Sequence, residues 1–119
     1  MGKVAIICNS SEPKCVFPPF ILGSSAAASG DEVVIFFTPA GAPVLVKGEM
    51  EKIRSQKGLP DLIELYDGLR NLGGKIWICE LALEAKGLKK EDFREGVEIV
   101  GATTFMAEIK DANVTFSFG

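Results

Sequence analysis

Lys3-Val-Ala-Ile-Ile-Cys8 is a nearly unbroken apolar run close to the start of the chain. A strand with one face in solvent alternates apolar and polar residues, whereas a strand covered on both faces does not. The run therefore predicts a buried strand of a parallel sheet. Glu32-Val-Val-Ile-Phe-Phe37 is the most β-prone segment of the chain and predicts a second strand.

Strands and helices are expected to alternate along the rest of the chain. An alternating order of this kind is typical of a parallel sheet with helices on both faces. The 119 residues have the size of one ordinary domain. We predict one α/β domain over residues 1–119, a doubly wound sheet of about five mainly parallel strands. Further strands are expected at Lys75–Cys79, Val97–Val100 and Asn113–Phe118, and helices at Val16–Ser29, Pro60–Leu72, Glu80–Lys86 and Gly101–Lys110, with short helices between Val44 and Arg54.

Composition and charge argue against several classes of function. The net charge of −3 offers no basic surface to a phosphate backbone, so nucleic acid is not an expected partner. The longest apolar stretch, Val33–Phe37, is too short to span a membrane. Met1–Val4 runs directly into a strand pattern instead of a signal peptide. We expect a cytoplasmic protein.

The chemistry of the chain must work without histidine, which is absent. This excludes Ser-His-Asp triads, Cys-His dyads and histidine metal ligands. The three cysteines, Cys8, Cys15 and Cys79, are odd in number and form no CxxC pair, which argues against a disulfide framework and a closed zinc site. We expect free thiols, no metal and no other cofactor.

Cys79 is the best candidate for a reactive group. It ends a predicted strand and directly precedes a predicted helix, where unpaired N–H groups and the helix dipole favour an anion such as a thiolate. This hypothesis requires that solvent reaches the thiol. The alternative is a structural cysteine in the core, because free cysteine is among the most buried residue types.

The roles of the other two cysteines depend on the strand order. Ligands bind beyond the carboxyl ends of the strands in an open α/β sheet. If the order were 2-1-3-4-5, the first and third strands would be neighbours, and Cys8 would be a possible second thiol beside Cys79. Cys15 is expected to be an incidental residue of the loop after the first strand.

Three residues after the first two strands are expected to line a pocket at the same edge: Asn9, Thr38 and Gly41. An alternative is a flavodoxin-like phosphate loop made by Asn9-Ser-Ser11, which would belong to a flavin-binding module. Glu12 argues against that alternative, since a carboxylate is poorly placed beside a phosphate.

Four segments, taken in their order and spacing, resemble the DsrE/DsrF-like family of sulfur-relay proteins. They are Glu32–Thr38 followed by Gly41, Cys79-Glu-Leu-Ala-Leu-Glu-Ala-Lys-Gly87, Val97–Gly101, and the last helix with Val114–Phe118. The resemblance covers nearly the whole chain. It implies a small α/β sandwich of parallel strands that assembles as a trimer or hexamer, and the exposed residues expected at Val44–Val46 would suit a subunit contact.

The resemblance also implies a function. Better-known members carry sulfur as a persulfide or thiosulfonate on the cysteine of the second segment, which matches Cys79, and pass it between donor and acceptor proteins. The chain departs from the commoner pattern at Pro18-Pro19 and Thr38–Ala40, and it lacks the second cysteine that some relatives have after Cys79. An intracellular sulfur carrier or sulfurtransferase is therefore expected. A non-catalytic oligomeric or small-ligand-binding subunit with a structural Cys79 is the alternative.

Overall fold

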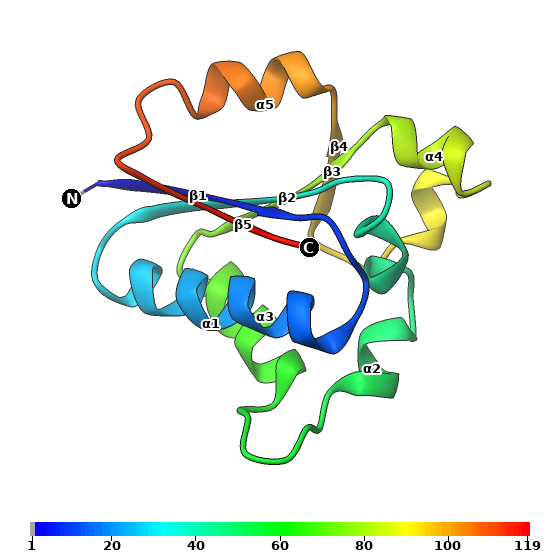
Figure 1. The fold of residues 1–119 in the computed structure, drawn as a ribbon, viewed down its shortest axis with the longest axis horizontal. Helices are drawn as coiled ribbons and strands as arrows, with labels where there is room; N and C mark the ends of the chain where they lie inside the picture. The colour runs from blue at the N-terminus through cyan, green and yellow to red at the C-terminus, as the bar shows by residue number, and fades with distance from the viewer. Residues whose placement is uncertain (1) are drawn as a thin grey trace.

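The computed structural model, which describes residues 2–119, contains five strands in one sheet (Figure 1). All neighbouring strands are parallel. The strands are β1 (Lys3–Cys8), β2 (Glu32–Phe37), β3 (Lys75–Cys79), β4 (Val97–Val100) and β5 (Val114–Phe118). The predicted parallel α/β sheet is confirmed, and each strand lies within one residue of its expected bounds.

The strand order is β4-β3-β2-β1-β5, which differs from the order considered above. Each of the first four strands lies beside the preceding one, and the chain then crosses the whole sheet so that β5 pairs with β1. β2 therefore separates β1 from β3 by two strand spacings, about 10 Å. The assumption that β1 and β3 are neighbours is wrong.

The helices cover the two faces of this sheet unequally. Right-handed crossovers that advance in one direction place their helices on one face, and a return crossover places its helix on the other. Figure 1 accordingly shows α1 and α3 on one face and α5 alone on the opposite face. The helices are α1 (Pro13–Ala28), α2 (Glu49–Ile53), α3 (Leu62–Asn71), α4 (Leu81–Ala85) and α5 (Ala102–Glu108), with 3-10 turns η1 (Ala42–Leu45) and η2 (Lys90–Asp92).

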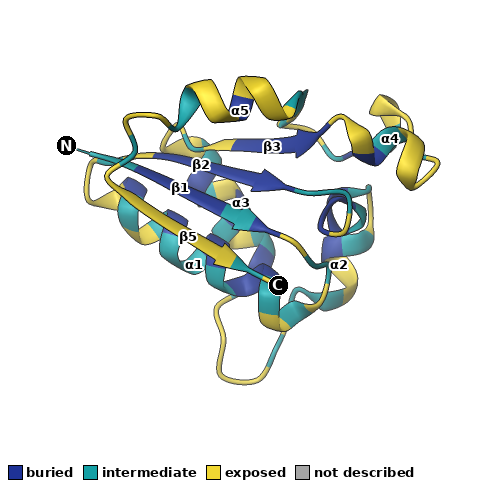
Figure 2. Cartoon of the chain, turned by 45° about the horizontal axis from the view of Figure 1, so that its top comes forward, coloured by how far each residue is buried: buried dark blue, intermediate teal, exposed yellow. Residues whose placement is uncertain are grey.

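Alternating side chains of the strands build two separate cores. On β2, Val33, Ile35 and Phe37 point toward α1 and α3, whereas Val34 and Phe36 point toward α5. Both sets are buried, which explains why the strand reads as one apolar run. The core under α5 is small, and its buried members are Ala5, Val34, Phe36, Trp77, Cys79 and Phe105. Figure 2 shows the buried central strands, the mostly exposed α5 and the exposed edge strand β5.

Two local expectations are wrong. Val44 and Leu45 are buried at 4% and 0% exposure, because η1 folds back onto the larger core, so they are not available for a subunit contact. α1 begins at Pro13 and not at Val16 as predicted, so Pro18 and Pro19 lie beyond the first turn of the helix. Among residues 2–119, no helix has the length and apolar character needed to cross a membrane.

Candidate functional site

Cys79 is the last residue of β3 and pairs with Val100 of β4. Its side chain belongs to the small core under α5, and only 4% of the residue is exposed. Phe105 of α5 closes this core and stacks on Phe36, with 4.2 Å between the ring centroids. The expectation of a solvent-accessible Cys79 thiol is therefore wrong for this conformation, because alternate residues of β3 face α5.

The helix after Cys79 is shorter than expected. α4 contains five residues, and Glu80, its N-cap residue, separates it from the cysteine. The Glu80 N–H donates to the Val100 carbonyl at 2.9 Å, so it continues the sheet instead of pointing to the thiol. Because the dipole of a helix grows from aligned peptide units, five residues supply little stabilisation of a thiolate. Burial under α5, and not a helix terminus, is the main feature of the Cys79 site.

Cys8 lies on the opposite face of the sheet, in the larger core, with 0% exposure. Its thiol donates to the Ser10 carbonyl at 3.3 Å and to the Cys15 carbonyl at 3.4 Å. The Cys15 carbonyl needs this donor because the residue four positions later is Pro19, which has no N–H. Cys8 therefore has a structural role in holding the start of α1, and the sheet separates it from Cys79. The expected position of Cys8 as a second thiol beside Cys79 is therefore wrong.

Cys15 is a helical residue and not a loop residue. It lies in the first turn of α1 and is half-buried. The three cysteines thus occupy different environments: one in each core and one on a helix at the surface of the larger core. The structure does not bring them together at one edge.

Burial raises the pKa of the Cys8 thiol from 9.0 to about 11. The folded protein therefore retains a proton that the unfolded chain releases, so the free energy of unfolding should fall as the pH rises from 9 to 11. A shift of this size corresponds to about 2 to 3 kcal/mol. We expect chemical denaturation to show a loss larger by that amount in the wild type than in Cys8→Ser, which keeps a donor and does not titrate there. Burial also raises the pKa of the Tyr66 hydroxyl, and its contribution is the same in both proteins. Parallel pH profiles of the two proteins would contradict this assignment.

Asn9, Thr38 and Gly41 do lie together, at the carboxyl ends of β1 and β2. The Thr38 hydroxyl donates to the Asn9 side-chain carbonyl. The Ser11 hydroxyl donates to the Ala40 carbonyl at 3.0 Å, so it is engaged in closing the loop. These contacts hold the loops that follow β1 and β2 against each other. A cavity of about 480 Å³ lies elsewhere, between the start of α1 and the loop before α3, and is lined by residues that include Phe17, Ile21 and Leu59.

Gly41 is required by this packing. A Cβ atom at Gly41 would lie 2.3 Å from the Cys8 carbonyl oxygen, which is backbone and cannot move aside cheaply. We expect Gly41→Ala to lower the free energy of unfolding by about 1 to 3 kcal/mol in urea denaturation. Gly68→Ala is the matched control, because Gly68 lies in α3 and no heavy atom outside the nearby backbone of that helix lies within 4 Å of the added Cβ. The control should gain up to about 1 kcal/mol, and equal losses in both variants would contradict the close approach.

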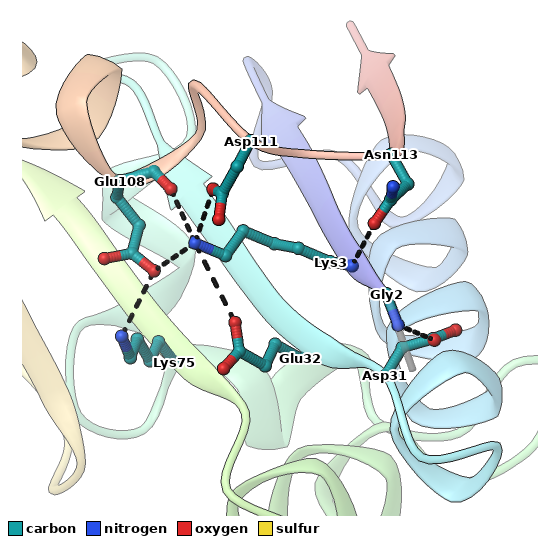
Figure 3. Close-up of polar contacts among 8 residues, drawn as sticks. All are labelled: Gly2, Lys3, Asp31, Glu32, Lys75, Glu108, Asp111 and Asn113. Carbon is teal, nitrogen blue, oxygen red and sulfur yellow. Dashed lines mark hydrogen bonds and ion pairs between the residues drawn. The ribbon is translucent and has the colours of Figure 1, made fainter.

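The carboxyl end of α5 is anchored by an ion-pair cluster at the amino edge of the sheet (Figure 3). Lys3 Nζ donates to the Glu108 carbonyl and to Asp111 Oδ1, each at 2.8 Å, and Lys75 Nζ lies 3.2 Å from Glu108 Oε2. Partial burial alone would raise the pKa of Glu108, but hydrogen bonds from Lys75 and Lys3 outweigh it and lower that pKa. The helix over Cys79 is thus held by one buried aromatic side chain and one polar anchor.

Two features of this site were not identified from the sequence as functional. Phe105 is buried, and its position over the Cys79 core depends on the return crossover. Trp77 is 6% exposed. Its indole Nε1 is buried and has no hydrogen-bond partner among residues 2–119. The i, i+2 spacing of Trp77 and Cys79 on one strand was the available signal.

The chain is similar to several known proteins. It is 31% identical over 98 residues to the uncharacterized protein MJ0760 of Methanocaldococcus jannaschii, in an alignment that covers 82% of this chain but only 35% of that relative. It is 28% identical to the sulfur carrier protein DsrE2 of Allochromatium vinosum, over 87% of this chain and 89% of the relative. Its fold is similar to the crystal structure of the ychN protein from E. coli, with a TM-score of 0.79, 15% identity and coverage of 99% and 100% of the two chains. The sequence pattern of one family matches residues 2–118, and the chain belongs to that family, the DsrE/DsrF-like family.

Proposed function

We propose that the chain is a sulfur-relay protein in which Cys79 carries sulfane sulfur as a persulfide. The observation that carries the proposal is the position of Cys79, at the end of β3 in a small apolar core closed by one seven-residue helix. The similarity to a protein named as a sulfur carrier supports it. A buried site suits a carrier, because it keeps a bound sulfur away from free thiols until a partner engages the protein.

The proposed chemistry consists of two thiol exchange steps. In loading, the Cys79 thiolate attacks the terminal sulfur of a polysulfide or persulfide donor. A new S–S bond forms, the adjacent S–S bond of the donor breaks, and the shortened donor leaves with the electron pair. In delivery, an acceptor thiolate attacks the outer sulfur and Cys79 leaves as a thiolate. The two steps balance without metal, flavin or external electrons.

The proposal implies a donor protein and an acceptor protein, each presenting a sulfur atom at the Cys79 site. We place this exchange in the cytoplasm, where unpaired thiols stay reduced. Because the thiol is buried, α5 must move before either partner reaches it. The cycle is therefore that of a carrier with a gated site.

We also propose that the chain forms a homo-oligomer, a trimer or hexamer. Edge strand β5 supports this proposal, because Val114 is 44% exposed and Phe116 is 38% exposed on its surface. An exposed apolar edge strand favours association with another chain. Multi-angle light scattering at micromolar concentration should report a mass of three or six chains. A monomer at that concentration would contradict the proposal.

A second candidate function is favoured by the 4% exposure of Cys79. In this alternative the cysteine is structural, and the chain is a non-catalytic subunit of an assembly. Incubation with polysulfide followed by intact mass spectrometry separates the two functions. A carrier gains the mass of sulfur at Cys79 in the native state and loses it to a thiol acceptor. A structural subunit gains no sulfur at Cys79 until it is unfolded.

A further inference from the structure

The indole N–H of Trp77 is a buried donor with no acceptor. The residue is 6% exposed, and its Nε1 lacks a hydrogen-bond partner among residues 2–119. An indole nitrogen can donate a hydrogen bond but cannot accept one, so a neighbouring donor cannot satisfy it. Buried donors without partners are rare in folded proteins, because each loses its hydrogen bond to water on burial. The unpaired N–H therefore needs a physical explanation.

Trp77 and Cys79 belong to the same small core, and the Lys75 ammonium lies 5.5 Å from the centroid of the Trp77 ring. They lie two residues apart on β3 and point to the same face, which places their Cα atoms about 6.7 Å apart. Both belong to the small core that Phe105 closes. An indole side chain is long enough to span that distance along the strand. No other tryptophan is present in the chain.

Loading of sulfur would create an acceptor in the same core. A persulfide is extended by one S–S bond of about 2 Å beyond the cysteine sulfur. Its outer sulfur carries negative charge when ionised, and an anion in an apolar core is strongly destabilised unless it receives a hydrogen bond. The unloaded protein thus has a donor without an acceptor, and the loaded protein would have an anion that requires a donor.

We infer that Trp77 Nε1–H donates a hydrogen bond to the outer sulfur of a persulfide on Cys79. This inference rests on the proposed function. It makes Trp77 the group that holds the sulfur inside the closed site and that favours an anionic sulfur cargo over an uncharged one. The alternative acceptor within the chain is Glu98, which pairs with Trp77 across β3 and β4 but is exposed to solvent.

Proton–nitrogen NMR tests this directly, because a single tryptophan produces a single indole N–H resonance. The Cys15→Ser protein, which keeps Cys79 and lacks the half-buried surface thiol, is loaded with polysulfide, desalted, and checked by intact mass for one added sulfur atom. We expect the indole proton to move downfield on loading and to return when a thiol acceptor removes the sulfur. Glu98→Gln should show the same movement. A loaded protein with an unmoved resonance overturns this inference alone, whereas a protein that never gains sulfur overturns the proposed function together with it.

A variant provides the second test. The alkylation rate of the loaded protein is measured against pH, and its midpoint reports ionisation of the persulfide. In Trp77→Phe the midpoint should move up by about one pH unit, because one hydrogen bond to an anion is worth about tenfold in its ionisation. Phe36→Leu is the control, since it loosens the same core without removing a donor. Its rate should change while its midpoint stays, and equal midpoints in all three proteins overturn the inference.

Discussion

Cys79→Ser is expected to abolish the uptake of the carried sulfur from polysulfide and to leave only the adventitious sulfur that Cys15 takes up. A serine hydroxyl does not form the S–S bond on which the carrier depends, and it is not ionised at neutral pH, so the loss should be complete. The fold should survive, because serine is close to cysteine in size and its hydroxyl costs about 1 to 3 kcal/mol in the apolar core. Intact mass spectrometry after loading and desalting measures the result.

The control for this experiment is Cys15→Ser. Cys15 is half-buried on α1 and would react with polysulfide without any special site. Its replacement should leave sulfur on Cys79 and remove only adventitious sulfur. If Cys79→Ser retained the sulfur adduct and Cys15→Ser lost it, the assignment of Cys79 as the carrier cysteine would be wrong. Peptide mapping of both proteins identifies which cysteine holds the sulfur.

The contrast between Cys8 and Cys79 shows how far sequence patterns reach. Both were identified as strand-terminal cysteines, and both do end a strand. Their relative faces depend on the register between strands, which the sequence of each strand does not contain. Cys8 pairs with Phe37, and Phe37 pairs with Ile78, one residue before Cys79, so the two cysteines point to opposite faces and lie in separate cores. The local pattern of apolar residues predicts where each strand lies, but it does not predict which strands are neighbours or how they are aligned.

The burial of Cys79 was unpredictable for a related reason. Apolar runs predict that both faces of β1 and β2 are covered, which is correct. They do not predict how many helices cover each face. One face carries α1 and α3, and the other carries a single helix of seven residues. Whether such a helix covers a given strand end depends on where Phe105 meets Phe36, a contact between residues far apart in sequence. Tertiary packing decides the exposure of this thiol.

The thin cover over Cys79 leads to a prediction about access. Phe105 is the one buried residue of α5, and half-buried Ile109 at the end of the helix packs against the same core. A Phe→Ala change in a core costs about 3 to 5 kcal/mol. If reagents reach the thiol by local detachment of α5, the Phe105→Ala change lowers the free energy of that detachment by this amount. Alkylation of Cys79 in native buffer should then be faster in Phe105→Ala by on the order of 100-fold to 1000-fold.

Leu69→Ala distinguishes local from global opening. Leu69 is fully buried in the core on the other face, and its truncation costs about 2 to 5 kcal/mol. Under local opening it should leave the alkylation rate of Cys79 nearly unchanged, whereas global unfolding would accelerate alkylation in both variants by comparable factors.

Glu108→Gln weakens only the polar anchor and should give a smaller acceleration, of the order of tenfold or less. Since the pKa of Glu108 is lowered, that anchor should persist in mildly acidic buffer and weaken only as the pH falls through its lowered pKa. A gate with these properties would explain how a thiol buried in an apolar core can exchange sulfur with a partner while the larger core stays folded.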